Sequence, residues 1–211
     1  MKIKVCGMRD AENIRAVERL DIDWMGFIFY PRSPRCVPDE EPYAEAIRRC
    51  TKTKVGVFVN AGREEMEDKA SRYGLSCLQL HGSESPVLCE ALRQQGYCVV
   101  KAFSVAEAGD LMLADAYASH ADYFLFDTKG DVYGGSGKSF DWRALDAYRG
   151  ETPFLLGGGI HPASLCELRR LAHPRMAGID VNSGFETAPA LKDIARLEAF
   201  INQFKNKQES I

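Results

Sequence analysis

The sequence lacks the long apolar segments found in membrane proteins and secreted precursors. No run approaches the roughly 18 apolar residues needed to cross a bilayer, and the N-terminal stretch MKIKVCGMRD has no apolar signal-peptide core. The seven cysteines are an odd number and form no Cys-x-x-Cys pair. This pattern argues against a disulfide framework and against a zinc site. We therefore expect a cytoplasmic protein without membrane association.

An excess of positive charge is also missing. The formal net charge of the 211 residues is −3, which argues against a broad surface for nucleic acid, so any anion site must be local. No linker, charge block or low-complexity segment divides the chain, and its length suits one substantial domain. We expect a single catalytic domain spanning residues 1–211 and no nucleic-acid partner.

Short apolar runs alternate with stretches of helical periodicity along the whole chain, and eight of these runs are predicted strands. The predicted strands are 3–5, 24–28, 54–59, 77–80, 98–103, 123–127, 153–157 and 178–181. The predicted helices include 11–19, 42–50, 64–73, 86–95, 162–171 and 192–203, with N-caps at Asp10 and Ser85 and a short helix within 139–148.

This alternation predicts an α/β protein with parallel strands, and eight units in this length are typical of a (β/α)8 TIM barrel. A doubly wound open sheet is the alternative. Its Gly-x-Gly-x-x-Gly fingerprint is absent, because the first predicted strand ends in VCGMRD.

Polar residues follow the predicted strands, at the barrel end where active sites form. The candidates are Cys6, Arg35, Asn60, Gln79, His81, Asp127, Gly158, Gly159, Asp180, Ser183 and Gly184. Cys6 and Asp127 carry a thiol and a carboxyl group that are suited to act as base and acid. Arg35 can bind both oxygens of a carboxylate. The alternatives are a buried apolar role for Cys6, a structural acceptor role for Asp127 and a solvated loop position for Arg35.

Two glycine-containing loops follow the last two predicted strands. Gly158 with Gly159, and Ser183 with Gly184, let backbone N–H groups approach a phosphate at its usual position in such barrels. Turn closure is the alternative for either loop alone. The stretch YGGSGKS at 133–139 departs from a P-loop, because Val132 stands where that motif needs glycine. We interpret residues 129–139 as a mobile flap over the site.

Seven segments, taken in order, resemble the phosphoribosylanthranilate isomerases of tryptophan biosynthesis. They are KVCGMRD, GFIFYPRSPRCV, VGVFVN, LQLHGSES, FLFDTKGDVYGGSGKSFDW, LLGGGIHP and GIDVNSGFETAPALKDIARLEAFI. The resemblance implies a (β/α)8 barrel that converts N-(5′-phosphoribosyl)anthranilate to 1-(2-carboxyphenylamino)-1-deoxyribulose 5-phosphate. This is an Amadori rearrangement that uses no cofactor and no metal. The implied partner is a phosphosugar bearing an anthranilate group, and the implied assembly is a monomer or a homodimer.

The resemblance also implies roles for individual residues. Cys6 is the expected general base at the sugar C2, and Asp127 is the expected general acid at the ribose ring oxygen. Arg35 is expected to bind the anthranilate carboxylate. Phosphate contacts are expected at Gly158, Gly159, Ser183 and Gly184, while Gln79, His81 and Asp180 line the site. This chain departs from the family at Cys36, Gly157 and Asn182, where an aromatic residue, alanine or serine, and serine are respectively common.

Two other functions fit parts of this pattern. A phosphosugar isomerase acting on an aminoribosyl substrate of histidine biosynthesis would use the same rearrangement. Such enzymes pair two aspartates, so Cys6 at the base position disfavours this alternative. A catalytically silent phosphosugar-binding protein would not need both Cys6 and Asp127.

Overall fold

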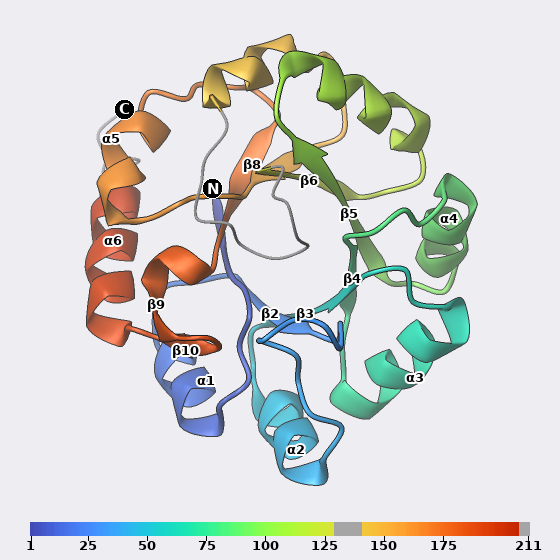
Figure 1. The fold of residues 1–211 in the computed structure, drawn as a ribbon, viewed down its shortest axis with the longest axis vertical. Helices are drawn as coiled ribbons and strands as arrows, with labels where there is room; N and C mark the ends of the chain where they lie inside the picture. The colour runs from blue at the N-terminus through green and yellow to red at the C-terminus, as the bar shows by residue number, and fades with distance from the viewer. Residues whose placement is uncertain (129–140, 207–211) are drawn as a thin grey trace.

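The computed structural model describes residues 1–128 and 141–206. Its eight parallel strands β1 to β8 close into a barrel, in which each strand pairs with the next and β8 pairs with β1. Helices surround this ring of strands on the outside (Figure 1). The predicted (β/α)8 barrel is therefore confirmed.

The strands lie close to their predicted positions. They are β1 Lys2–Val5, β2 Trp24–Ile28, β3 Thr53–Phe58, β4 Cys77–Leu80, β5 Cys98–Val105, β6 Tyr123–Thr128, β7 Phe154–Leu156 and β8 Met176–Val181. The predicted bounds of β2 and β4 match those observed, and the ends of the other strands differ by at most two residues.

The helical segments include both α-helices and 3-10 helices. The α-helices are α1 Ala11–Glu18, α2 Glu41–Arg49, α3 Arg63–Tyr73, α4 Pro86–Gln94, α5 Leu165–Leu168 and α6 Ile194–Asn206. The 3-10 helices are η1 Ala108–Tyr117, η2 Trp142–Ala147, η3 Pro162–Ser164 and η4 Ser183–Phe185. Both predicted N-caps are confirmed, because the side chain of Asp10 accepts from two backbone N–H groups of α1 and that of Ser85 accepts from one in α4. No helix in the described ranges is long and apolar enough to cross a membrane.

Two predicted helices differ from the structure. Residues 162–171 begin with a 3-10 turn, because the Ser164 N–H bonds to the carbonyl three residues back at His161, and only the single turn α5 follows. The last helix begins at Ile194 rather than at residue 192, because Lys192 belongs to a small antiparallel ribbon. That ribbon is formed by β9 Glu186–Ala188 and β10 Leu191–Lys192.

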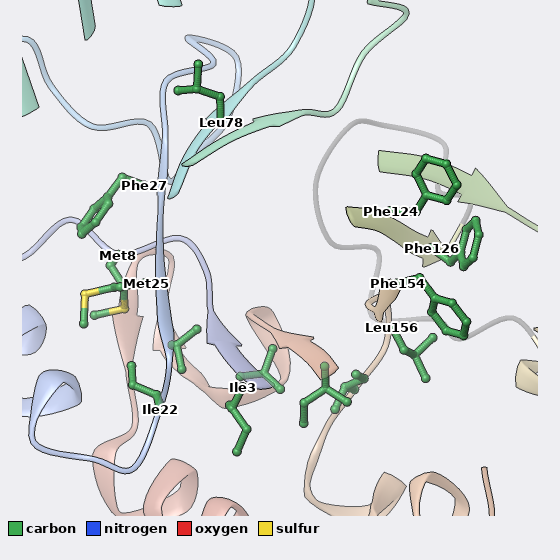
Figure 2. Packing of buried hydrophobic residues seen from close by; sticks show 14 of the residues in the cluster. Ile3, Met8, Ile22, Met25, Phe27, Leu78, Phe124, Phe126, Phe154 and Leu156 are labelled. Atoms are coloured by element: carbon green, nitrogen blue, oxygen red, sulfur yellow. The ribbon is translucent and has the colours of Figure 1, made fainter. Parts of the chain in front are cut away.

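Alternate residues of each barrel strand face opposite sides of the wall, as the period of a β-strand requires. On β6, Phe124 and Phe126 belong to the main core cluster, whereas Leu125 between them belongs to a separate inner cluster. Figure 2 shows the rings of Phe124, Phe126 and Phe154 gathered together, with the centroids of Phe126 and Phe154 5.0 Å apart. The same alternation turns Asp127, the next residue on the Leu125 side, toward the barrel interior.

Candidate active site

A pocket opens where the barrel strands end. Its volume, including the solvent-filled space at its open mouth, is about 720 Å³. Most of the predicted site residues line it, namely Cys6, Gln79, His81, Asp127, Gly158, Gly159, Asp180 and Ser183. Ser33 and Asn182 also line it, whereas the predicted residues Arg35, Asn60 and Gly184 are not among its described lining residues. The predicted flap at 129–139 lies outside the described residues.

The carboxyl group of Asp127 lies at the end of a short chain of polar side chains. Its Oδ2 is 3.3 Å from Nε2 of His81, and its Oδ1 accepts a hydrogen bond from the Thr128 backbone N–H at 2.9 Å. The other ring nitrogen of His81, Nδ1, is 3.0 Å from Nε2 of Gln79. These contacts orient a carboxyl group that remains partly exposed to the pocket.

The thiol of Cys6 lies beside a buried ion pair that the sequence analysis did not anticipate. Lys4 is fully buried, and its Nζ donates to Asp180 Oδ2 at 2.8 Å. Burial raises the pKa of the Cys6 thiol, the positive charge of Lys4 opposes that rise, and the negative charge of Asp180 adds to it. Cys6 is therefore a neutral thiol in the free site, next to a cation that favours its thiolate.

Each member of this ion pair opposes the effect of burial on the pKa of the other. Burial lowers the pKa of Lys4, but the charges of Asp180 and Cys6 outweigh burial and raise it. Burial raises the pKa of Asp180, and Lys4 opposes that rise. Asp180 Oδ1 is buried without a hydrogen-bond partner in the described ranges. This oxygen is therefore available to accept a hydrogen bond from a bound ligand.

Arg35 is held by a second buried cluster. Its Nε donates to both carboxylate oxygens of Glu186 at 3.0 Å, and its Nη2 donates to Oε2 at 2.7 Å. Lys192 Nζ donates to Glu186 Oε1 at 2.6 Å. Burial tends to raise the pKa of Glu186, but the hydrogen bond from Arg35 and the charge of Lys192 hold it below its ordinary value. Two basic groups thus share one carboxylate.

The sequence analysis missed Lys4, Glu186 and Lys192. The alternation of strand residues was a usable signal for Lys4, which stands two residues before Cys6 on β1 and therefore on the same face. Glu186 and Lys192 had no comparable signal. In the sequence, the residues of the ribbon that brings them together have the pattern of a loop followed by the start of a helix.

The two predicted phosphate loops have the backbone that close approach requires. Gly158 and Gly159 have φ of +77° and +68°, a left-handed backbone conformation that is unfavourable for residues with a Cβ atom. A Cβ on Gly158 would lie 2.3 Å from the Thr128 backbone nitrogen. A Cβ on Gly184 would lie 2.2 Å from the Ile160 carbonyl oxygen. The loops after β7 and β8 therefore pack closely together beside Asp127.

The positions that depart from the family pattern are accommodated locally. Asn182 lines the pocket and accepts a hydrogen bond from Lys192 at 2.8 Å. The thiol of Cys36 donates to the Val37 carbonyl at 3.6 Å. A Cβ on Gly157 would lie 3.0 Å from Leu125 Cδ1, so the absence of a side chain relieves crowding inside the barrel.

A closed barrel of eight parallel strands, with a pocket of polar side chains at the C-terminal ends of the strands, places the chain in the class of TIM-barrel enzymes. Residues 3–203 match the family model for N-(5′-phosphoribosyl)anthranilate (PRA) isomerase. The chain belongs to this family, and the resemblance seen in the sequence is confirmed.

Individual relatives agree with the family model. An N-(5′-phosphoribosyl)anthranilate isomerase from Phocaeicola vulgatus is 53% identical over 207 residues, covering 98% of this chain and 99% of the relative. The crystal structure of phosphoribosyl anthranilate isomerase from Thermotoga maritima has a TM-score of 0.83 at 33% identity, covering 98% and 99% of the two chains. Another such isomerase, in complex with reduced 1-(o-carboxyphenylamino)-1-deoxyribulose 5-phosphate, has a TM-score of 0.80 at 30% identity, with coverage of 98% and 99%.

Proposed function

We propose that this chain converts N-(5′-phosphoribosyl)anthranilate to 1-(2-carboxyphenylamino)-1-deoxyribulose 5-phosphate in tryptophan biosynthesis. The observation that carries this proposal is the placement of Cys6 and Asp127 in one pocket, directly after β1 and at the end of β6, with the glycine loops that follow β7 and β8 between them. Family membership supports it. A related isomerase of known structure binds a reduced form of the same product.

The rearrangement moves protons and needs no external oxidant. Asp127 gives its proton to the ribose ring oxygen, and the ring opens to a Schiff base between C1 and the anthranilate nitrogen. The Cys6 thiol gives up its own proton to solvent, and the resulting thiolate removes the proton from C2, which yields an enolamine. Protonation at C1 and loss of the C2 hydroxyl proton, as the enolamine tautomerises, then give the ketone. His81 orients the Asp127 carboxyl group, and Lys4 stabilises the thiolate.

Anchors for both ends of the substrate lie beside these two groups. Glu186 occupies the Nε and Nη2 edge of Arg35, so the edge formed by Nη1 and Nη2 can face the anthranilate carboxylate. The cluster of Arg35, Glu186 and Lys192 contains two basic groups and one acid, and a substrate carboxylate would balance its charge. Backbone N–H groups at Gly158, Gly159, Ser183 and Gly184 are suited to bind the phosphate.

The test is the loss of anthranilate fluorescence with freshly prepared phosphoribosylanthranilate, after subtraction of its uncatalysed breakdown. We expect rapid conversion by the wild type, with the ribulose phosphate identified as product. Cys6→Ala and Asp127→Ala should each lower turnover by about 10²-fold or more, the scale of lost acid or base catalysis. Near-normal turnover by both variants would show that the assigned roles are wrong. A wild type no faster than background would overturn the activity itself.

The remaining expectations extend this proposal. We propose that residues 1–211 act as one catalytic domain in the cytoplasm, as a monomer or a homodimer and without nucleic acid. All seven cysteines have free thiols, which fits a reducing compartment.

A further inference from the structure

One buried lysine connects the two proposed substrate anchors. Lys192 is on β10, and its side chain is fully buried. Its Nζ lies 2.8 Å from Asn182 Oδ1 and 2.6 Å from Glu186 Oε1. These two partners lie on either side of Ser183 and Gly184, so Lys192 spans the loop to which we assign the phosphate.

The backbone of Lys192 is fixed from a different part of the barrel. The side-chain amide of Asn13, a buried residue of α1, donates to the Lys192 carbonyl at 2.9 Å and accepts from its N–H at 2.8 Å. Burial lowers the pKa of Lys192, and the charge of Glu186 opposes that change. The ammonium group therefore extends from a rigid base toward the loop after β8.

The second partner of Lys192 leads to the other anchor. Glu186 accepts from Lys192 and from the Nε and Nη2 of Arg35, and its Oε1 also accepts from the Ala190 N–H at 3.1 Å. This carboxylate sets the plane of the Arg35 guanidinium. Because Lys192 fixes one oxygen of Glu186, it also fixes the orientation in which Arg35 meets a carboxylate.

The two anchors also meet at the residue that follows Cys6. A Cβ placed on Gly7, whose φ is +74°, would lie 2.6 Å from Asn182 Oδ1 and 2.8 Å from Arg35 Cδ. Asn182 and Arg35 thus pack on the same backbone turn, next to the proposed base. A shift in either side chain would be felt at the other and at the turn that carries Cys6.

We propose that Lys192 is a positioning residue for both substrate anchors, holding Arg35 through Glu186 and the Ser183 and Gly184 loop through Asn182. The inference rests on the proposed function, because it assumes that these groups bind the carboxylate and the phosphate. Lys192 itself is buried and is not among the described residues that line the pocket. Its effect on binding must therefore pass through its partners.

A buried ion pair elsewhere in the barrel provides the matched control. Lys101 Nζ lies 3.1 Å from Glu84 Oε2 and 2.6 Å from the Gly82 carbonyl, and the side chains of Lys101 and Glu84 are as buried as those of Lys192 and Glu186. The hydrogen bonds of this pair reach the end of β4 and the loops after β3 and β4, away from Arg35 and Asn182. Lys101→Met therefore removes a buried lysine without touching either anchor.

The experiment compares Lys192→Met with Lys101→Met in the full chain, with folding verified by circular dichroism. Isothermal titration measures anthranilate and inorganic phosphate separately, as probes of the two anchors. We expect Lys192→Met to raise both dissociation constants by about tenfold, the scale of one lost charged hydrogen bond. Lys101→Met should lower the melting temperature similarly but leave both constants within about twofold of the wild type. In turnover assays Lys192→Met should raise KM more than it lowers kcat.

Several outcomes would overturn the proposal. Unchanged affinity for both probes in folded Lys192→Met would show that the lysine only stabilises the fold, and weaker binding of one probe alone would refute the claim that it positions both anchors. Equal losses in Lys101→Met would show a general effect of destabilisation. If Lys192→Met does not fold, Lys192→Gln keeps an amide donor, and the same two titrations decide the question. A wild type that binds both probes but does not turn over the substrate would instead refute the proposed function.

Discussion

Replacing Lys4 with methionine should reduce both stability and the reactivity of Cys6. Lys4 is fully buried, and its Nζ lies 2.8 Å from Asp180 Oδ2, so the change leaves a buried carboxylate without its cation. Breaking a buried ion pair costs about 3–5 kcal/mol. Each kcal/mol shifts the melting temperature of a chain of this size by about 2–4 °C. We therefore expect scanning calorimetry to show a fall of about 6–20 °C.

The pH dependence of this loss has a definite sign. Burial already raises the pKa of Asp180 in the folded wild type, and Lys4 opposes that rise. Without Lys4 the folded-state pKa rises further, so the folded variant binds a proton at pH values where the unfolded chain does not. Stability of the variant then decreases as the pH rises through this interval. The deficit relative to the wild type should be smaller at acidic than at neutral pH.

The activity of the same variant tests the electrostatic argument for Cys6. Loss of the Lys4 charge raises the pKa of the thiol further, and each pKa unit lowers the thiolate fraction about tenfold near neutral pH. We expect kcat/KM to fall about tenfold for each pKa unit of that rise and to recover partly in alkaline buffer. In Lys4→Met/Asp180→Asn the melting temperature should return toward the wild type, because removing both partners leaves no unpaired charge. Wild-type kcat/KM at neutral pH in Lys4→Met would refute the reasoning.

Two further outcomes are expected. Because burial raises the pKa of Cys6, kcat/KM of the wild type should increase steadily from neutral into alkaline buffer as the thiolate forms, and a flat profile would contradict a neutral resting thiol. Gly158→Ala should weaken phosphate binding in titrations, because φ is +77° and the new Cβ would lie 2.6 Å from Asp127 Oδ1. The control Gly62→Ala has no atom within 4 Å of the added Cβ, so a loss of the same size there would count against this explanation.

The barrel could be predicted from the sequence because its strands are short apolar runs whose ends are marked by polar or glycine residues. Most of the site followed from one rule, that residues directly after parallel strands gather at one end of the barrel. Cys6, Asp127 and Gly158 were found in this way, and all three line the pocket. The rule needs only the strand ends, which the apolar runs locate to within two residues.

What the sequence could not provide were contacts between residues far apart along the chain. Arg35 and Glu186 are separated by 151 positions, and the two-residue strand β10 is too short to show a pattern. Lys192 was therefore assigned to the helix that starts at Ile194. The protonation preference of Cys6 was likewise inaccessible, because it depends on burial and on the relative positions of Lys4 and Asp180.

The buried charges of this barrel explain why Cys6 is not a thiolate before the substrate binds. A cysteine that was a thiolate at rest would be exposed to oxidation and to reaction with other electrophiles. Here burial keeps Cys6 neutral, while Lys4 lies ready to stabilise the thiolate. Cys6 would then ionise only during the catalytic cycle, when the bound substrate fills the pocket and the proposed anchors hold its C2 close to the sulfur. Such an arrangement needs anchors that are rigid before binding, and the buried contacts of Arg35, Glu186 and Lys192 are suited to provide that rigidity.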